Sequence, residues 1–292
     1  MIIGVDVGGS SLTAGVVEFT EPIPRTEPAE HPIDSSAGRE RILEAFVHVI
    51  ETTAARGRPA DDPPPAGLRL GFGFPGPFDY ERGICYIRGL TKYEGIYGLD
   101  IGAELRERVP QITDIRFRND AVAAVAGEGR YGVGAAYDRL LGLTLGTGMG
   151  SGYMRGGRIV THPNETDPEG WLFPVPFRGA RADDHFSTRG LQRRLAEAGS
   201  STTDVATAAG LARDGGPAEQ EAFRRFGSEL AAFIAPYLAD FDAQALVLLG
   251  GISRAFDLFV EPLRAGLGGA HVVTGTLGPK AAVLGAAALF DE

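Results

Sequence analysis

The sequence has little cysteine and no excess of positive charge. Cys85 is the one cysteine among its 292 residues, which excludes an intramolecular disulfide and any metal site built from several thiolates. The 28 basic residues are outnumbered by 38 acidic ones, so the formal net charge is −10. Because a nucleic-acid surface needs basic residues to neutralise phosphates, this balance argues against nucleic acid as a partner.

Long apolar runs are also missing. No stretch reaches the roughly 18 residues that a membrane-spanning helix requires, and the first residues have a strand pattern instead of a charged and then apolar leader. We therefore expect a cytoplasmic protein with no membrane partner. Apolar residues make up 43% of the chain, which at this length is enough for two cores, so two lobes are the expected organisation.

Glycine, by contrast, is abundant, and it marks turns after apolar strands. Residues 2–17 have the pattern of a strand, a glycine turn and a second strand. The backbone N–H groups of Gly8, Gly9 and Ser10 are placed to bind an anion such as phosphate, and Asp6 at the strand end is placed to hold Mg²⁺ through water. An ordinary hairpin with a polar strand end is the alternative interpretation.

The same pattern occurs again in the second half of the chain. Gly146, Thr147 and Gly148 stand between two strands, and Gly250 and Gly251 follow a third apolar strand. Ligands of α/β proteins bind at the carboxyl ends of strands, so we expect the first two turns to hold phosphates and the third to contact a nucleoside. The strand-turn-strand order excludes a Walker loop, and the two halves are expected to be structural repeats.

A literal G-x-G-x-x-G stretch over residues 71–76 is not a dinucleotide fingerprint. Prolines flank its last glycine, Gly76, where that fingerprint requires a helix to begin. We expect a rigid, substrate-facing loop instead. Further on, Asn119 and Asp120 stand between a short strand and a helix. Asp120 is the candidate base for an attacking hydroxyl in phosphoryl transfer, and a plain helix N-cap is its structural alternative.

Hydrophobic periodicity predicts the remaining elements. Residues 20–32 fit either an edge strand or a loop, and the irregular stretch 162–186 is interpreted as a functional or crossover loop. Pro236 is expected to bend or shorten the helix that contains it. Helices are expected near residues 38–56, 101–109, 121–131, 187–198, 203–213, 218–240, 255–267 and 280–289, and strands near 68–74, 84–90, 115–118, 140–145, 151–155, 158–160, 245–249 and 271–274.

Five motifs, in order and in register, resemble the ROK family of bacterial sugar kinases and repressors. They are Asp6-Val7-Gly8-Gly9-Ser10, Gly71-Phe72-Gly73-Phe74-Pro75-Gly76, Asn119-Asp120-Ala121, Leu143-Thr144-Leu145-Gly146-Thr147-Gly148-Met149-Gly150 and Leu248-Leu249-Gly250-Gly251-Ile252-Ser253. The resemblance implies an α/β fold with two actin-like, ribonuclease-H-like lobes around an ATP cleft. It assigns residues 1–118 and 278–292 to a small lobe and residues 119–277 to a larger one, and it implies a homodimer.

The resemblance also implies roles for individual residues. Asp120 would be the base that takes a proton from the sugar hydroxyl, Asn119 and Gly76 would contact the sugar, and Asp6 would lie near Mg²⁺. ATP would be bound by the three glycine turns described above.

Two departures from the family matter. Members commonly carry a G-E-x-G-H motif and then a cysteine cluster that binds zinc; with Cys85 alone, no zinc site is expected. In the corresponding stretch, counting from the preceding strand favours Glu169 as the sugar-binding carboxylate, whereas a local pattern similar to polyphosphate-using glucokinases favours Glu165. Asp183 is also expected to face the sugar, and His185 either contacts the sugar or lies on the surface.

The expected function is ATP- and Mg²⁺-dependent phosphorylation of a hexose hydroxyl, with glucose as the default substrate of the family. A non-catalytic sugar sensor and a polyphosphate-dependent glucokinase are the alternatives. Family repressors carry a DNA-binding helix-turn-helix ahead of the first strand, whereas here the strand pattern begins at residue 2. That difference argues against a repressor.

Overall fold

The computed structural model describes residues 1–19, 23–24, 27–58, 65 and 67–291. The chain divides into two compact units: unit 1 comprises Met1–Tyr131 and Pro279–Glu292, and unit 2 comprises Gly132–Gly278. The expected boundary at residue 118 differs from this division by one helix, α3 (Asp120–Tyr131). That helix belongs to unit 1 because it packs along the C-terminal helix α9 (Lys280–Ala287).

Unit 1 is built on a sheet with the strand order β3-β2-β1-β5-β8, in which β4 also pairs with β2. β1 is antiparallel to β2 and parallel to β5, and β5 is parallel to β8. Two short strands lie in the stretch 20–32, whose residues 20–22 and 25–26 lie outside the described part of the chain. The strands are β1 (Ile2–Val7), β2 (Ser11–Glu18), β3 (Ile23–Pro24), β4 (Ala29–Pro32), β5 (Leu68–Phe74) and β8 (Ile112–Asn119).

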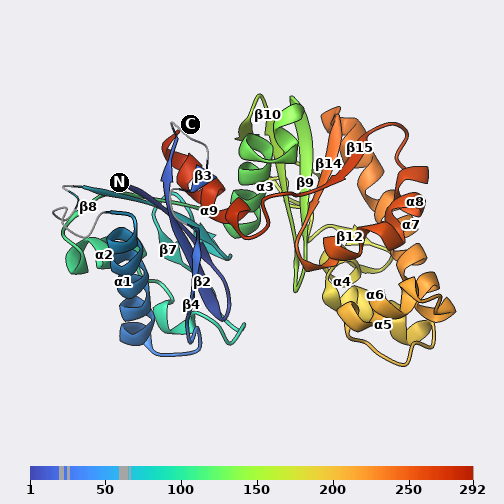
Figure 1. The fold of residues 1–292 in the computed structure, drawn as a ribbon, viewed down its shortest axis with the longest axis horizontal. Coiled ribbons are helices and arrows are strands. Elements are labelled where there is room, and N and C mark those ends of the chain that lie inside the picture. The colour runs from blue at the N-terminus through green and yellow to red at the C-terminus, as the bar shows by residue number, and fades with distance from the viewer. Residues whose placement is uncertain (20–22, 25–26, 59–64, 66, 292) are drawn as a thin grey trace. The chain divides into compact units, whose positions relative to one another are not determined.

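Helices cover both faces of this sheet, as Figure 1 shows. Helices α1 (Arg39–Arg56) and α2 (Ile101–Arg108) lie on one face, and α3 and α9 on the other. Strand β1 alternates accordingly: Ile3 and Val5 enter the core shared with α1, whereas Gly4 faces α9. Asp6 therefore lies on the face that carries α3 and α9.

The strand expected over residues 84–90 is wrong beyond Cys85. Only β7 (Ile84–Cys85) is extended there, and it pairs with β6 (Phe78–Asp79). The chain that follows has positive φ angles at Gly89, Thr91 and Tyr93, which an extended strand cannot contain. A short 3₁₀ helix, η1 (Glu94–Ile96), then leads toward α2.

Helix α9 packs at backbone distance on the sheet and on α3. A Cβ atom at Gly4 or Gly71 would lie 2.0 or 1.9 Å from a carbonyl oxygen of α9. In the same way, a Cβ at Gly127 of α3 would lie 1.9 Å from an α9 carbonyl oxygen, and one at Gly285 of α9 would lie 1.7 Å from an α3 carbonyl oxygen. Only glycine permits these approaches.

Unit 2 repeats the strand arrangement of unit 1. Its sheet has the order β11-β10-β9-β14-β15, with β9 antiparallel to β10 and parallel to β14, and β14 parallel to β15. Because β2-β1-β5-β8 has the same order and the same directions, the predicted structural repeat is confirmed. The strands are β9 (Arg139–Leu145), β10 (Met149–Arg155), β11 (Arg158–Val160), β14 (Ala245–Leu249) and β15 (His271–Thr274).

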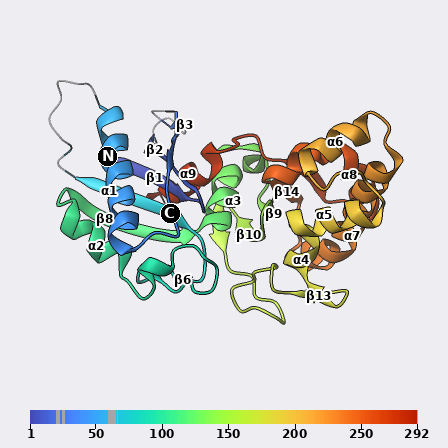
Figure 2. The same cartoon turned by 90° about the horizontal axis from the view of Figure 1, so that it is seen from below.

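The helices of unit 2 gather on one side of β9 and β14 (Figure 2). Helix α7 continues through Pro236 because Leu238 and Phe241 remain buried in the core, so the proline does not shorten it. Within the described part of the chain, no helix is long and apolar enough to cross a membrane. The further elements are η2 (Val133–Ala136), β12 (Pro176–Phe177), β13 (Ala180–Arg181), α4 (Ala182–Phe186), α5 (Thr188–Glu197), α6 (Val205–Arg213), α7 (Pro217–Phe241), η3 (Gly251–Ala255), α8 (Phe256–Ala265) and η4 (Ala288–Phe290).

The close packing of α9 leads to a stability prediction. Gly127→Ala should lower the free energy of unfolding by about 3 kcal/mol, because its Cβ meets backbone that has no room to move. Gly210→Ala in α6 is the matched control: its Cβ would meet nothing within 4 Å, and alanine favours a helix by up to about 1 kcal/mol. Thermal unfolding followed by circular dichroism measures both, and equal midpoints for the two variants would contradict the packing.

Candidate functional site

The parallel strands of unit 1 bring three predicted features to one edge of the sheet. Asp6 of β1 is in register with Gly73 of β5, and Phe74 of β5 is in register with Asn119 of β8. The carboxyl ends of these strands therefore meet where the stretch 71–76 ends, which is the usual position of a ligand in an α/β protein.

Two partly buried carboxylates lie together at this edge. A Cβ placed on Gly73 would lie 3.8 Å from Asp6 Oδ1 and 3.5 Å from Asp120 Cα, so the strand passes close to both residues. Burial, followed by the neighbouring Asp120 carboxylate, raises the pKa of Asp6 to about 7. Burial also raises the pKa of Asp120, against the opposing effects of the Ala121 N–H and the Lys92 ammonium group. Such a pair attracts a cation.

The residues present fit a magnesium ion in part. Two buried carboxylates are hard oxygen donors of the kind that Mg²⁺ prefers, and Asp6 was predicted to hold the ion through water. Among the described residues, no group of three or more His, Cys, Asp or Glu side chains could hold a metal ion alone. Water or substrate phosphates would have to complete the shell, and the role of Asp6 stays a prediction.

Asn119, not Asp120, caps helix α3. The Asn119 Oδ1 atom accepts the Val122 N–H at 3.2 Å, the usual bond of an N-cap side chain. Asp120 is the first helical residue, and its Oδ1 accepts the N–H of the next residue, Ala121, at 2.8 Å instead of an N–H one turn further on. The N-cap alternative therefore applies to the neighbour of the candidate base.

Tyr80 fixes the orientation of Asn119, and the sequence analysis missed it. Asn119 Nδ2 donates to the Tyr80 hydroxyl at 3.1 Å, and that hydroxyl donates to the Phe74 carbonyl at 3.1 Å. The same hydroxyl would lie 3.2 Å from a Cβ on Gly76. Tyr80 thus joins Asn119 to the loop that was predicted to face the substrate.

The first glycine turn offers two of the three amides expected to bind phosphate. The Gly8 N–H donates to the Ser11 carbonyl at 2.9 Å and closes the turn, so the expectation for this amide is wrong. In the described part of the chain, the Gly9 and Ser10 N–H groups make no hydrogen bond. These two exposed amides remain free for an anion.

Two side-chain hydroxyl groups donate hydrogen bonds to the carbonyls of this turn. Tyr93 Oη donates to the Gly8 carbonyl at 2.5 Å, and Ser35 Oγ donates to the Gly9 carbonyl. Neither residue was identified from the sequence, because the contact from Tyr93 to Gly8 spans 85 residues. The turn is consequently fixed by two segments that lie outside its own hairpin.

The second glycine turn, in unit 2, has the same construction. The Gly146 N–H donates to the Gly148 carbonyl at 3.0 Å, which closes the turn. Among the described residues, Thr147 and Gly148 N–H make no hydrogen bond. The Gly146 carbonyl accepts both the N–H of Thr188, at 2.7 Å, and its hydroxyl, at 2.8 Å.

Asp183 supports this second turn. Its Oδ1 accepts the Met149 N–H at 2.7 Å and would lie 3.3 Å from a Cβ on Gly148, and its Oδ2 pairs with Arg189 at 2.6 Å. Both carboxylate oxygens therefore have partners inside unit 2. That Asp183 also faces a sugar stays a prediction.

Glu165 and Glu169, the two predicted sugar-binding carboxylates, have similar surroundings. Both are exposed on the irregular stretch that the sequence predicted, and the backbone between them is held by short-range bonds. Asp167 Oδ1 accepts the Glu169 N–H at 2.9 Å, and Asn164 Oδ1 accepts the Asp167 N–H at 2.9 Å. The loop is ordered by its own Asx turns, and either glutamate is free to meet a ligand.

His185 does not lie on the surface. Its side chain is buried, with 9% exposed, and its ring stands edge-on to Phe177 at 5.3 Å. Burial, followed by the neighbouring Arg193 and Arg194 guanidinium groups, lowers its pKa. The surface alternative is therefore wrong, and the residue belongs to the interior of unit 2.

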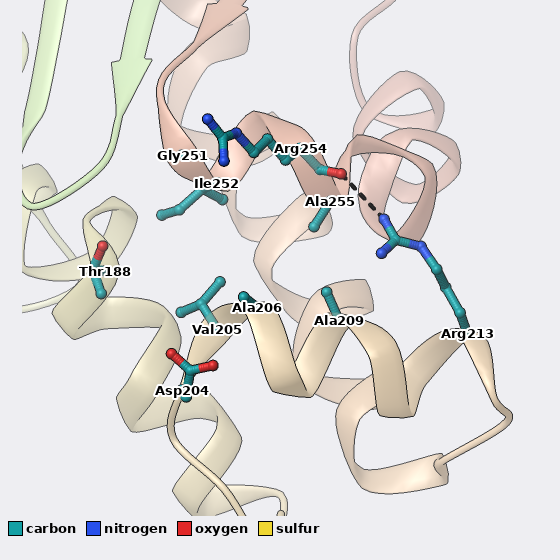
Figure 3. A pocket seen from close by; sticks show the side chains of 10 residues that line it. All are labelled: Thr188, Asp204, Val205, Ala206, Ala209, Arg213, Gly251, Ile252, Arg254 and Ala255. Carbon is teal, nitrogen blue, oxygen red and sulfur yellow. Dashed lines mark hydrogen bonds between the residues drawn. The ribbon is translucent and has the colours of Figure 1, made fainter.

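A pocket of about 360 Å³ opens beside the third glycine turn, entirely within unit 2 (Figure 3). Apolar side chains from α6 and η3 form its walls, and a few polar groups stand around them, which is the usual character of a small-molecule site. Gly251, which was predicted to contact a nucleoside, is one of the lining residues. The full lining is Thr188, Asp204, Val205, Ala206, Ala209, Arg213, Gly251, Ile252, Arg254 and Ala255.

Two contacts shape this pocket. Gly250 has a φ of +89°, and a Cβ there would lie 2.4 Å from the Leu145 carbonyl, so only glycine lets the ends of β14 and β9 approach. Arg213 donates to both Asp257 oxygens at 2.8 and 2.7 Å and to the Arg254 carbonyl at 3.1 Å. The sequence predicted the glycines but not the walls that α6 supplies.

Comparison with known proteins shows what the chain resembles. The model of the ROK family matches residues 2–292. A glucokinase from Thermotoga maritima is 26% identical over 323 residues, which cover 100% of this chain and 97% of the relative. The structure of an inorganic polyphosphate/ATP-glucomannokinase from Arthrobacter sp. strain KM has a TM-score of 0.71 and 26% identity, over 99% of this chain and 98% of that one.

A ROK family glucokinase from Streptomyces griseus, solved with glucose and AMPPNP, gives a TM-score of 0.74. It is 23% identical and covers 99% of this chain and 98% of that one. At this identity the likeness shows the fold alone, which agrees with the predicted pair of actin-like α/β halves.

The buried carboxylates give a prediction about pH. A carboxyl whose pKa rises on folding, from 3.8 to about 7 for Asp6, makes the folded state less stable as pH increases through that window. Asp6→Asn should raise the free energy of unfolding at pH 8 by about 1–3 kcal/mol, and Asp120→Asn should raise it as well. The gain from Asp6→Asn should be much smaller near pH 4, where the folded-state Asp6 carboxyl is protonated.

Thermal unfolding midpoints at pH 8 and pH 4, without added metal, measure this effect. Asp114→Asn is the control, since that residue is partly exposed on β8 and pairs with Arg116. A variant of either buried carboxylate that unfolded below the wild type at pH 8 would contradict the electrostatic account.

Proposed function

The chain belongs to the ROK family, and from this premise we propose that it is a sugar kinase that transfers the γ-phosphoryl group of ATP to a hydroxyl of a hexose. The observation that carries the proposal is the position of Asp120. It is a partly buried carboxylate at the head of α3, beside a second partly buried carboxylate and beside an asparagine whose amide is held by Tyr80. Full-length relatives named glucokinase support a hexose as the acceptor.

On the acceptor side, unit 1 supplies the base and the means to orient the sugar. Asp120 accepts the proton of the attacking hydroxyl, and its raised pKa brings it nearer to the pH at which a general base works well. The Asn119 amide, held by Tyr80 and by the α3 backbone, offers its remaining hydrogen-bonding capacity to the sugar. Glu165 and Glu169 remain the predicted carboxylates for a further contact with the sugar.

Asp6 is the residue that would hold Mg²⁺, through water. The bound ion would neutralise charge on the donor phosphates, which is the main requirement of phosphoryl transfer besides positioning. The free amides of Gly9 and Ser10, and those of Thr147 and Gly148, are the groups that would bind phosphate oxygens.

Unit 2 supplies the nucleoside pocket. Apolar walls from Val205, Ala206, Ile252 and their neighbours suit a base, and polar groups at the rim suit a ribose. A polyphosphate chain has no part that needs such walls. The pocket therefore supports ATP as the donor over polyphosphate, although one structural relative is named for both donors.

Removing the Asp120 carboxylate tests its catalytic role. Asp120→Asn should lower kcat about 10²- to 10⁴-fold, because a general base contributes that much. The measurement is ADP release with ATP and Mg²⁺ over a panel of hexoses and N-acetylhexosamines. Full activity of the variant would contradict the assignment of the base, and no release by the wild type on any sugar would favour a sugar sensor.

The second prediction tests the donor. Ala206→Phe should raise the KM for ATP about tenfold or more, because the ring fills the pocket, while the KM for the sugar stays the same. Ala196→Phe, on an exposed position of α5 outside the pocket, is the control and should leave both constants unchanged. If the wild type worked with polyphosphate and not with ATP, the proposed donor would be wrong.

A further inference from the structure

Lys92 is an unusual cation in this chain. Only two of the 28 basic residues are lysines, Lys92 and Lys280. Lys280 pairs with Glu27 at 2.7 Å. Lys92 is half-buried, and among the described residues it makes no hydrogen bond or ion pair with another side chain. Its stem is therefore partly covered while its ammonium group remains available to an anion.

The backbone around Lys92 is held in a conformation that side chains rarely adopt. Thr91 and Tyr93, its two neighbours, have φ angles of +55° and +58°. Each such residue costs about 1–3 kcal/mol, and it persists only where the surroundings fix it. Here the Thr91 N–H donates to Glu94 Oε1 at 3.0 Å, and the Tyr93 N–H donates to the Ser35 carbonyl at 2.6 Å.

These contacts tie Lys92 to the first glycine turn. The Tyr93 side chain is fully buried, and its hydroxyl donates to the Gly8 carbonyl at 2.5 Å. Ser35, which accepts the Tyr93 N–H, donates its own hydroxyl to the Gly9 carbonyl. The segment that carries Lys92 is thus built onto the turn whose free amides were assigned to phosphate.

The charge of Lys92 also acts on the candidate base. Its ammonium group interacts electrostatically with the Asp120 carboxylate, which begins helix α3. Lys92 therefore stands near the carboxylate that receives the hydroxyl proton, on a segment anchored to the phosphate turn. The transferred phosphoryl group would be an anion that lies near both the first glycine turn and Asp120.

We propose that Lys92 binds the phosphoryl group as it is transferred, and then the phosphate of the sugar phosphate product. The inference rests on the proposed function. In the reaction, a bond forms between the sugar oxygen and the γ-phosphorus, the bond from that phosphorus to the β–γ bridging oxygen breaks with its electrons leaving on ADP, and the hydroxyl proton goes to Asp120. Lys92 keeps its proton and stabilises charge on the equatorial oxygens.

Lysine suits this task because its ammonium is a compact charge with three donors on a flexible stem. A hydrogen bond to a charged group contributes about 1.5–3 kcal/mol, which corresponds to about 10- to 100-fold in affinity. That stabilisation should appear for the phosphorylated sugar and not for the neutral one.

The test compares equilibrium binding of glucose and of glucose 6-phosphate by calorimetry, together with steady-state kinetics. Lys92→Met should weaken glucose 6-phosphate about 10- to 100-fold, leave glucose unchanged and lower kcat by at least the same factor. Lys92→Arg, which keeps the charge, should recover part of the product affinity. Lys280→Met, which removes the other lysine, should match the wild type in both measurements.

Three outcomes would overturn the inference. Equal weakening of glucose and glucose 6-phosphate by Lys92→Met would mean that the residue only shapes the sugar site. If Lys92→Met left both affinities and kcat unchanged while the wild type was active, the role of Lys92 would be refuted and the proposed function would stand. If the wild type bound neither compound and phosphorylated no hexose, the proposed function would fail and the inference with it. Lys92→Gln repeats the comparison should the methionine variant unfold.

Discussion

The arrangement of unit 1 depends on the contact between helix α9 and the backbone beneath it. Glycines at positions 4 and 71 leave no side chain between α9 and strands β1 and β5, and Gly127 and Gly285 let α3 approach the same helix. Strand β1 ends at the turn that follows Asp6, and α3 begins with Asp120. A helix from the far end of the chain therefore fixes the two elements that carry the carboxylates, and Gly73 leaves room for both.

This arrangement is electrostatically unfavourable because it places two carboxylates close together. Asp6 and Asp120 are both partly buried, each with a raised pKa, and among the described residues no arginine forms an ion pair with either of them. Natural proteins accept such unfavourable groups where chemistry needs them. The large aromatic core of unit 1, which includes Phe46, Phe72 and Phe74, is where the compensating stabilisation comes from.

The sequence predicted those residues of the candidate site that belong to short local motifs. Gly250, Gly251, Asn119 and Asp120 stand next to the strands that position them, so an apolar run followed by glycine or Asn-Asp was enough to find them. Tyr80 was missed because its bond to Asn119 spans 39 residues, and it lies in a segment without hydrophobic periodicity.

The same reason explains why the irregular stretch after Cys85 was misassigned. Its apolar residues indicated a strand, but the positive φ angle at Tyr93, just after this stretch, is accompanied by bonds from Tyr93 to Ser35 and Gly8, far away in the sequence. No local pattern contains that information. The walls of the pocket beside Gly251 were missed likewise, since α6 was predicted as a helix without any indication of what its alanines face.

The two repeats share a way of preparing a turn for an anion, and they differ in what they add to it. The N–H groups of Gly8 and Gly146 each close their own turn, and the next two amides of each turn remain free. Hydroxyl groups donate hydrogen bonds to carbonyls of both turns. Unit 1 adds buried carboxylates, which suit proton transfer and a cation. Unit 2 adds a pocket with apolar walls, which suits a base. Repetition of the strand order therefore accounts for the two similar glycine turns, and divergence of the segments around them accounts for the different roles proposed for the two units.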